Sequence, residues 1–139
     1  MRAASLIRIW ALAAAAVVLA ACAAPEERDP VREDAPIRDF IDVNALAEVR
    51  VIRTLDQLSS REVNDYYVIV STRREDYLLE YFSRCLPNYD GRVEPDVRRD
   101  SRALYPGADT YRGCRIKTIY ALEPGQADEL HEIGKATSR

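Results

Sequence analysis

Histidine and glycine are scarce in this sequence, and basic residues are not in excess. The single histidine, His131, lies close to the C-terminus. Ser-His-Asp or Cys-His catalysis and histidine-bound metal sites are therefore not expected, because each needs a histidine held by a rigid scaffold. The five glycines form no Gly-rich phosphate-binding loop, so we predict no cofactor. A net charge of −3 argues against nucleic-acid binding, which requires an excess of Lys and Arg.

The first 21 residues differ from the rest of the chain. Arg2 and Arg8 precede residues 9–21, a run of thirteen residues without a charge. This pattern is typical of an export signal, and the run is shorter than the roughly 20 residues that span a bilayer. It ends in Leu19-Ala20-Ala21-Cys22, which resembles the lipobox of bacterial lipoproteins. The resemblance implies cleavage after residue 21 and a thioether between Cys22 and diacylglycerol. The alternative is an ordinary signal in which Cys22 is a small apolar residue.

The rest of the chain divides into a tether, a domain and a tail. Acyl chains on Cys22 would anchor the protein in a lipid bilayer, and Ala rather than Asp at position 23 resembles the sorting pattern for the outer membrane, facing the periplasm. Residues 22–36 contain three prolines and few large apolar side chains, which predicts a disordered tether. Residues 37–123 are predicted to form the domain. Residues 124–139 have only Leu130 and Ile133 to pack, which predicts a flexible or weakly helical tail.

Four segments of the domain are expected to be β-strands. Residues 66–72 (YYVIVST) are apolar on both faces, as in a central strand, and residues 77–82 (YLLEYF) follow after a connection of hairpin length. Residues 49–55 are a further strand. The last strand is expected at residues 115–122, directly after Cys114. Alternate residues should share one face of this strand: Cys114, Ile116, Thr118, Tyr120 and Leu122.

These strands predict a mainly β fold. We expect a small antiparallel β-sheet or partly open barrel with at most one or two short helices, one of them near residues 42–49. An exported chain meets an oxidising compartment, where Cys85 and Cys114 are the thiols left to pair if Cys22 is lipidated. We therefore predict one disulfide between them. A redox-active or metal-binding pair is the alternative, but it lacks a C-x-x-C spacing and a nearby histidine.

Two short motifs indicate a family. Tyr77-Leu78-Leu79 is followed after five residues by Cys85, and some thirty residues later comes Cys114-Arg115-Ile116 with Ile119. This spacing resembles a domain-of-unknown-function family of small Gram-negative lipoproteins with the pattern Y-L-L-x(5)-C and C-R-I-x-x-I. The sequence departs from the usual pattern in its charged stretch at residues 92–102. The resemblance implies an architecture but no activity.

Paired carboxylates could support hydrolysis of the glycosidase type. Asp76 and Glu80 share a strand parity, and Asp96 and Asp100 lie close together in the sequence. Neighbouring arginines make a solvated surface the stronger interpretation of both pairs. The segment Asn88-x-Asp90-Gly91 has the composition of a tight turn, and the remaining ligands of a calcium loop are missing.

Tyrosine and arginine are concentrated in the loops of the second half of the domain. Both residue types are enriched at the centres of interfaces, so these loops could bind an envelope protein or an anionic glycan, although they could also be ordinary loop residues. The candidate surface consists of Tyr89, Arg98, Arg99, Arg102, Tyr105, Tyr111 and Arg112. The sequence therefore predicts a membrane-anchored, non-enzymatic binding or structural module, with a small carboxylate-dependent hydrolase of envelope glycan or peptide as the alternative.

Overall fold

The computed structural model describes residues 34–53, 58–86 and 95–137, which belong to one compact unit, Arg32–Arg139. The expected signal peptide at 1–21, the lipidation site Cys22, most of the tether at 22–36 and Tyr89 lie outside the described residues. Among the described helices, none is long and apolar enough to cross a membrane. The architecture below therefore concerns the domain and the C-terminal segment.

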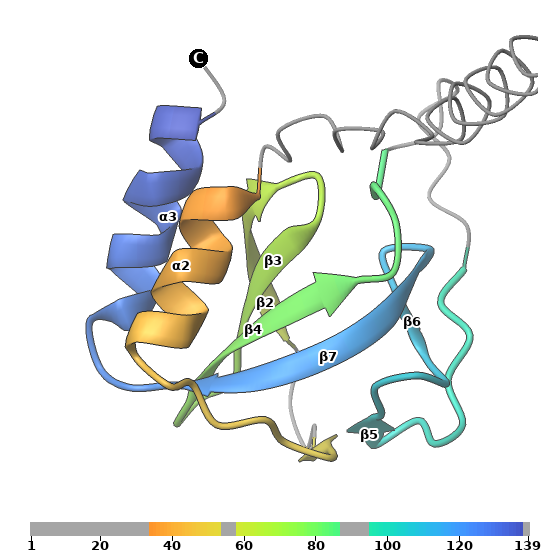
Figure 1. The fold of residues 1–139 in the computed structure, drawn as a ribbon. Helices are drawn as coiled ribbons and strands as arrows, with labels where there is room; N and C mark the ends of the chain where they lie inside the picture. The colour runs from red at the N-terminus through yellow and green to blue at the C-terminus, as the bar shows by residue number, and fades with distance from the viewer. Residues whose placement is uncertain (1–33, 54–57, 87–94, 138–139) are drawn as a thin grey trace, which may run out of the picture. The chain divides into compact units, whose positions relative to one another are not determined.

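The domain is built on an antiparallel sheet with the strand order β2-β3-β4-β7-β6. Figure 1 shows this sheet curving beside two helices. A separate two-stranded sheet pairs β1 with β5. The strands are β1 (Ile52–Arg53), β2 (Ser59–Asn64), β3 (Tyr67–Ser71), β4 (Asp76–Tyr81), β5 (Ala103–Leu104), β6 (Thr110–Tyr111) and β7 (Cys114–Leu122). The predicted mainly β, antiparallel fold with short helices and one disulfide is confirmed.

The two central strands form the predicted hairpin. Residues 67–71 pair with residues 76–81, and the connection is closed by Thr72, whose backbone N–H donates to the carbonyl of Glu75. Tyr67 and Ile69 of β3 face the helices, whereas Val68 and Val70 face the β1–β5 side. All four are at most 1% exposed. A strand that is apolar on both faces is thus covered on both faces, as its sequence predicts.

A β-bulge interrupts the pairing of β4 with β7. Glu80 lies opposite Thr118, but Tyr81 lies opposite Ile116, so Lys117 is an extra residue. Before the bulge Ile116 packs on the β1–β5 side, whereas beyond it Tyr120 packs on the helix side. The prediction that alternate residues from 114 to 122 share one face is therefore wrong, because the bulge reverses the alternation. The bulge also places Lys117 next to Glu80.

The first helix begins earlier than predicted. Helix α2 covers Ala35–Val43, and the residues after it up to 49 are not helical; instead Val49 donates its N–H to the carbonyl of Ile119 on β7. Pro36 in the first turn suits a helix start, because its fixed φ and missing N–H cost nothing there. Ile37, Phe40 and Ile41 follow at helical spacing and are buried. The last residues of the expected tether thus belong to the folded domain.

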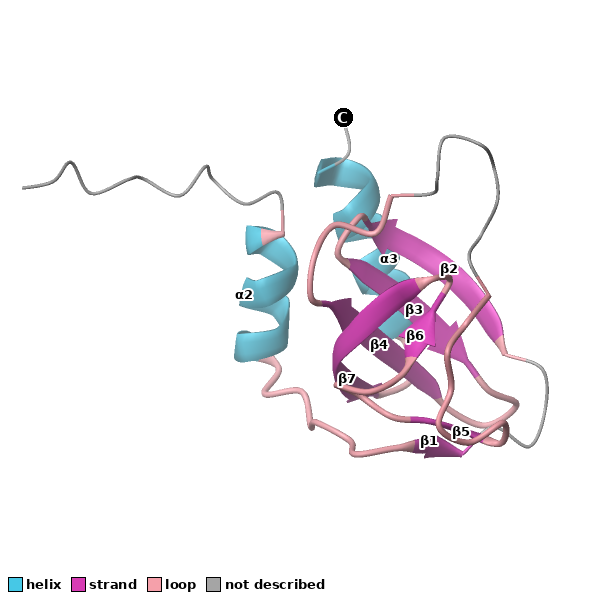
Figure 2. Ribbon diagram, turned by 90° about the vertical axis from the view of Figure 1, so that its right-hand side faces the viewer, coloured by secondary structure: helices cyan, strands magenta, loops and turns pink. Residues whose placement is uncertain are grey.

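The expected tail is a regular helix. Helix α3 covers Gln126–Thr137 and packs beside α2 and β2 (Figure 2). Ala127, Leu130 and Gly134 form its buried face, and Leu130 is 0% exposed. A side chain at Gly134 would overlap the backbone carbonyl of Val63 on β2, so glycine permits the close approach. Helix α3 thus packs on the domain through a few buried residues, although it has little apolar surface.

Candidate functional site

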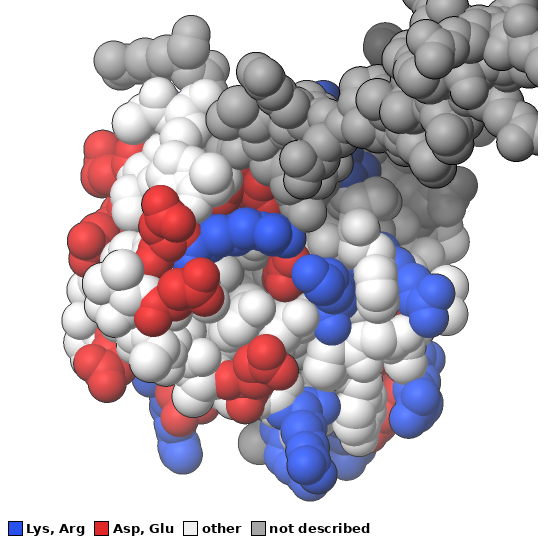
Figure 3. Space-filling view, in the orientation of Figure 1, with Lys and Arg blue, Asp and Glu red and all other residues white. Residues whose placement is uncertain are grey.

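Charge is unevenly distributed over the domain. Figure 3 shows acidic side chains gathered over the helices and basic side chains toward the end that carries β1 and β5. The exposed acidic residues of the two helices are Asp39, Asp42, Asp128, Glu129 and Glu132. The exposed arginines in and near the strands of the small sheet include Arg50, Arg53, Arg99 and Arg102. The basic end therefore contains part of the surface predicted from the sequence.

The β1–β5 pair brings Arg53 to this surface. Arg53 lies opposite Ala103, which directly follows Arg102. Ile52 and Leu104 are 1% and 0% exposed, so they attach the small sheet to the core. The alternation of the strand then leaves Arg53 exposed beside the buried Ile52. Sequence reasoning missed Arg53, because nothing in the local pattern indicates which segment its strand will meet.

The loop that carries Arg99 and Arg102 is organised by a buried carboxylate. Asp109 is 1% exposed. Its Oδ1 accepts a hydrogen bond from the N–H of Arg99 at 2.9 Å, and its Oδ2 accepts one from the N–H of Tyr105 at 2.8 Å. Its backbone also connects the loop to β7, because the N–H of Ile116 donates to its carbonyl at 3.1 Å. Sequence reasoning missed Asp109 too, although the preceding Pro-Gly is a turn signal.

Arg99 and Tyr105 contact one another directly. The guanidinium carbon of Arg99 lies 5.5 Å from the centroid of the Tyr105 ring, within the range of a cation–π interaction. Both backbones are held by Asp109, so the loop fixes both ends of this contact. The structure thus brings together two residues of the predicted surface, Arg99 and Tyr105.

The other described members of the predicted surface have structural partners. Tyr111 is 8% exposed and packs in the core, so it does not belong to the surface. Arg98 forms an ion pair with Asp96 at 3.5 Å, and Arg112 forms one with Glu62 at 2.6 Å. Tyr111 is buried because its side chain faces inward on β6. Loop composition suggested a binding role, but composition does not show which way a side chain points.

The members of the two candidate carboxylate pairs have separate positions or partners. Asp76 is the first residue of β4 and Glu80 the last but one, so they lie four residues and about 13 Å apart along the strand. Asp96 accepts a hydrogen bond from the N–H of Gly113 at 2.9 Å, whereas Asp100 accepts one from the N–H of Arg102 at 2.9 Å. Asp96 therefore connects its segment to the turn between β6 and β7, whereas Asp100 closes a local turn.

Glu80 belongs to a buried polar cluster beneath α2. It is 4% exposed, and Lys117 Nζ donates to its Oε1 at 2.7 Å. Arg38 of α2 lies 3.8 Å from the same oxygen and also pairs with Asp34, which is fully buried, at 3.1 Å. Burial and the charge of Glu80 raise the pKa of Tyr67, which lies among these groups. The opposite charges balance, so the cluster connects α2 to the sheet without leaving a buried charge unpaired.

The described residues contain no cluster of three or more His, Cys, Asp or Glu side chains that could hold a metal ion. His131 lies on α3, where its Nδ1 is 3.1 Å from the carbonyl oxygen of Glu62. The Asn88-x-Asp90-Gly91 segment lies outside the described residues. The histidine is thus part of the contact between α3 and β2.

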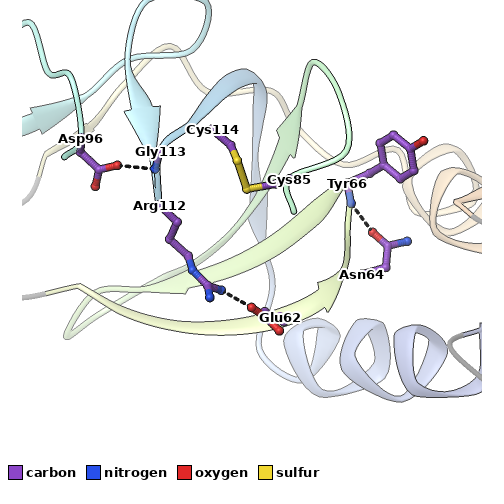
Figure 4. Close-up of a disulfide and its surroundings, with 8 residues drawn as sticks. All are labelled: Glu62, Asn64, Tyr66, Cys85, Asp96, Arg112, Gly113 and Cys114. Atoms are coloured by element: carbon purple, nitrogen blue, oxygen red, sulfur yellow. Dashed lines mark hydrogen bonds and ion pairs between the residues drawn. A yellow bond between two sulfur atoms is a disulfide. The ribbon is translucent and has the colours of Figure 1, made fainter. Parts of the chain in front are cut away.

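The predicted disulfide joins Cys85 to Cys114 (Figure 4). Their Cα atoms are 5.7 Å apart and 29 positions separate them in the sequence. The bond connects the segment after β4 to the first residue of β7, and both cysteines pack against the core. Next to it, the N–H of Cys85 donates to the carbonyl of Asp65 at 2.6 Å. The disulfide therefore holds the end of the sheet at which Arg112 meets Glu62.

The comparison with protein-family models agrees with this architecture. A model described as a family of unknown function, DUF6491, matches residues 5–136, which is nearly the whole chain. The chain belongs to the DUF6491 family. This confirms the predicted membership of a domain-of-unknown-function family. No curated protein and no solved structure matches this DUF6491 chain.

Proposed function

We propose that this DUF6491 protein is a lipid-anchored protein of the cell envelope whose domain faces the periplasm and acts as a non-enzymatic binding module. The observation that carries the proposal is the sequence Leu19-Ala20-Ala21-Cys22 at the end of an uncharged run that follows two arginines. Acylation of Cys22 would bury enough methylene groups to make membrane attachment permanent. The small residues at 20, 21 and 23 suit an outer-membrane lipoprotein.

Two features of the domain support this proposal. The Cys85–Cys114 disulfide is typical of proteins that mature in an oxidising compartment such as the periplasm. The exposed arginines around β1 and β5 provide a surface for an anionic partner, whereas Asp96, Asp100 and Glu80 each bind a structural partner within the domain. A tethered domain with such a surface suits binding better than hydrolysis.

Membrane fractionation of cells that produce Cys22→Ala tests the anchor. The wild-type protein should remain in the membrane pellet after washing with high salt, whereas Cys22→Ala should be released into the wash or remain an unprocessed precursor. The matched control is Ser83→Ala, a small substitution in the exposed turn after β4, which should stay in the pellet. If Cys22→Ala is processed and retained like the wild type, the lipoprotein proposal is wrong.

The sorting part of the proposal has its own test. Ala23→Asp introduces the residue whose absence favours the outer membrane. On a density gradient, the wild-type protein should sediment with outer-membrane markers and Ala23→Asp with inner-membrane markers. Identical sedimentation of the two proteins would leave the anchor intact but contradict the outer-membrane assignment.

A further inference from the structure

Two buried hydrogen-bond donors, on Tyr81 and Arg98, have no acceptor among the described residues. The buried side-chain atoms without a hydrogen-bond partner in this part of the chain are the Tyr81 hydroxyl, Nε of Arg98 and Nδ2 of Asn64. Tyr81 is only 4% exposed. A buried donor without an acceptor costs free energy, so such a group in a folded protein requires an explanation, for example a bound water or ion. The two donors therefore indicate a place where an acceptor from outside the chain can bind.

The two edges of the five-stranded sheet approach one another next to Arg98. Glu62 on β2 pairs with Arg112, which lies in the turn between β6 and β7, at 2.6 Å between the carboxylate and the guanidinium (Figure 4). Asp96 connects Arg98 to this turn, because its Oδ1 accepts a hydrogen bond from the N–H of Gly113 at 2.9 Å and its Oδ2 lies 3.5 Å from Nη2 of Arg98. The Arg98 side chain therefore lies beside the turn that carries Arg112.

Tyr81 reaches the same place from the core. It is the last residue of β4, and its side chain packs in the core cluster on the β1–β5 side of the sheet. Burial raises the pKa of Tyr81 above its ordinary value, and the charged groups that act on its hydroxyl are Arg112, Asp96 and Glu62. The unpartnered hydroxyl thus lies among the side chains that join the two edges of the sheet.

We propose that Tyr81, Arg98 and Arg112 form a binding site for a small carboxylate ligand. The acceptors at this place are already engaged, since Asp96 accepts from the backbone and Glu62 contacts Arg112. A guanidinium matches the two oxygens of a carboxylate, and Glu62 supplies such a group from within the chain. This inference goes beyond the proposed function, because it concerns a small-molecule site that depends neither on the lipid anchor nor on the arginines near β1 and β5.

Glu62 can leave Arg112 at little cost in free energy. The two side chains are 66% and 38% exposed, so water can replace the contact. The backbone of Arg112, by contrast, is held in place. Its φ of 56° is one that residues other than glycine rarely adopt, and Asp96 fixes the next residue, Gly113. Strained backbone of this kind is concentrated at positions that bind ligands. An incoming carboxylate could therefore exchange with that of Glu62 at a guanidinium whose backbone stays fixed.

Titration with sodium acetate, followed by NMR spectroscopy, tests the proposal on the full-length protein in neutral detergent micelles. The Nε–H signals of Arg98 and Arg112 should shift in a saturable way as acetate is added. Sodium chloride at the same concentration, and acetamide, which has the size of acetate without its charge, should leave both signals in place. Equal shifts with acetate and chloride would mean charge screening without binding, and equal shifts with acetamide would mean that no anion is recognised. Either result would overturn the proposal.

Two substitutions should change the affinity for acetate in opposite directions. Tyr81→Phe should weaken binding about tenfold, because a hydrogen bond to a charged acceptor is lost. Its control, Tyr77→Phe, removes a hydroxyl near the other end of β4 and should bind acetate like the wild type. Glu62→Gln should tighten binding about twofold, because the competing carboxylate is removed.

The control for Glu62→Gln is Glu132→Gln. Glu132 is also an exposed carboxylate in an ion pair, with Lys135 on α3, so its substitution removes the same charge away from the site. It should leave the affinity for acetate unchanged. The Glu62 position is exposed, so this arm remains decisive even if Tyr81→Phe fails to fold. Unchanged affinity in folded Tyr81→Phe, or in Glu62→Gln, would overturn the assignment and would leave the lipid anchor, which fractionation of Cys22→Ala tests, unaffected.

Discussion

The carboxylate of Glu62 and the guanidinium of Arg112 lie 2.6 Å apart, although they come from opposite ends of the strand order. Glu62 is on β2, one edge of the five-stranded sheet, and Arg112 is in the turn between β6 and β7 at the other edge (Figure 4). The sheet is thus curved until its two edges approach one another. The sheet therefore forms a partly open barrel, and the Glu62–Arg112 ion pair bridges its two edges.

The ion pair across the open side should contribute little free energy. The side chains of Glu62 and Arg112 are 66% and 38% exposed, so water and salt screen the charges. In a double-mutant cycle with Glu62→Gln and Arg112→Gln, we expect a coupling of about 0.5 kcal/mol in the free energy of unfolding, decreasing at high salt. A coupling above about 2 kcal/mol would mean that the pair is desolvated and that the edges are closed more tightly than described.

The disulfide should contribute far more. Cys85 and Cys114 are separated by 29 positions, and closing a loop of this size stabilises a small domain by about 3.5 kcal/mol. We expect Cys85→Ser/Cys114→Ser to lose about this amount in urea unfolding, and reduction of the wild-type protein to have the same effect. Without reductant, the denatured protein should show no thiol at these positions. A decrease in the free energy of unfolding of less than about 1 kcal/mol would mean that packing, and not the disulfide, stabilises this end of the sheet.

Gly134 allows a test of how α3 docks. In an exposed helix, Gly→Ala stabilises by about 1 kcal/mol, but a Cβ at position 134 would overlap the carbonyl of Val63. Gly134→Ala should therefore lower the free energy of unfolding by about 2 kcal/mol, as overpacking does. Lys135→Ala on the exposed face is the control and should change it by a few tenths. Stabilisation by Gly134→Ala would show that α3 is not held against β2.

Tyr77 should make the domain sensitive to alkaline pH. Burial, followed by the hydrogen bond to Glu75 and the charge of Glu75, raises the pKa of Tyr77 to about 12. The unfolded phenol ionises at about pH 10, so the stabilisation is complete below that pH and is lost as the pH rises toward 12. Unfolding free energies measured over this range should fall less steeply in Tyr77→Phe. An identical slope in both proteins would mean that Tyr77 is not buried as described.

Much of the sheet could be predicted from the sequence. The segments that became β3 and β4 carry β-branched and aromatic residues in short runs, and their polar connection has hairpin length, so local signals were sufficient. Helices α2 and α3 could not be predicted as docked elements. Each has only a few buried residues, and its stability comes from packing on a sheet that is distant in sequence. The bulge at Lys117 likewise depends on a partner strand.

The candidate site was predictable only in part. Arg99, Arg102 and Tyr105 belong to one loop and share a recognisable composition. Arg53 is brought opposite Ala103 by the pairing of two-residue strands some fifty positions apart, which is a long-range contact without a local signal. Asp109 organises the loop from a buried position, although aspartate is rarely buried unless it is hydrogen-bonded. Long-range pairing and burial therefore decided which of the predicted residues share a surface.

Mass spectrometry of the N-terminal peptide of the mature protein tests the central claim most directly. If the protein is a lipid-anchored module, the mature chain begins at Cys22 and this residue carries a thioether-linked diacylglycerol. The peptide mass should therefore exceed that of the unmodified peptide by the mass of this group, and Cys22→Ala should yield no lipid-modified peptide. A mature chain that begins at another residue, or an unmodified Cys22, would contradict the account.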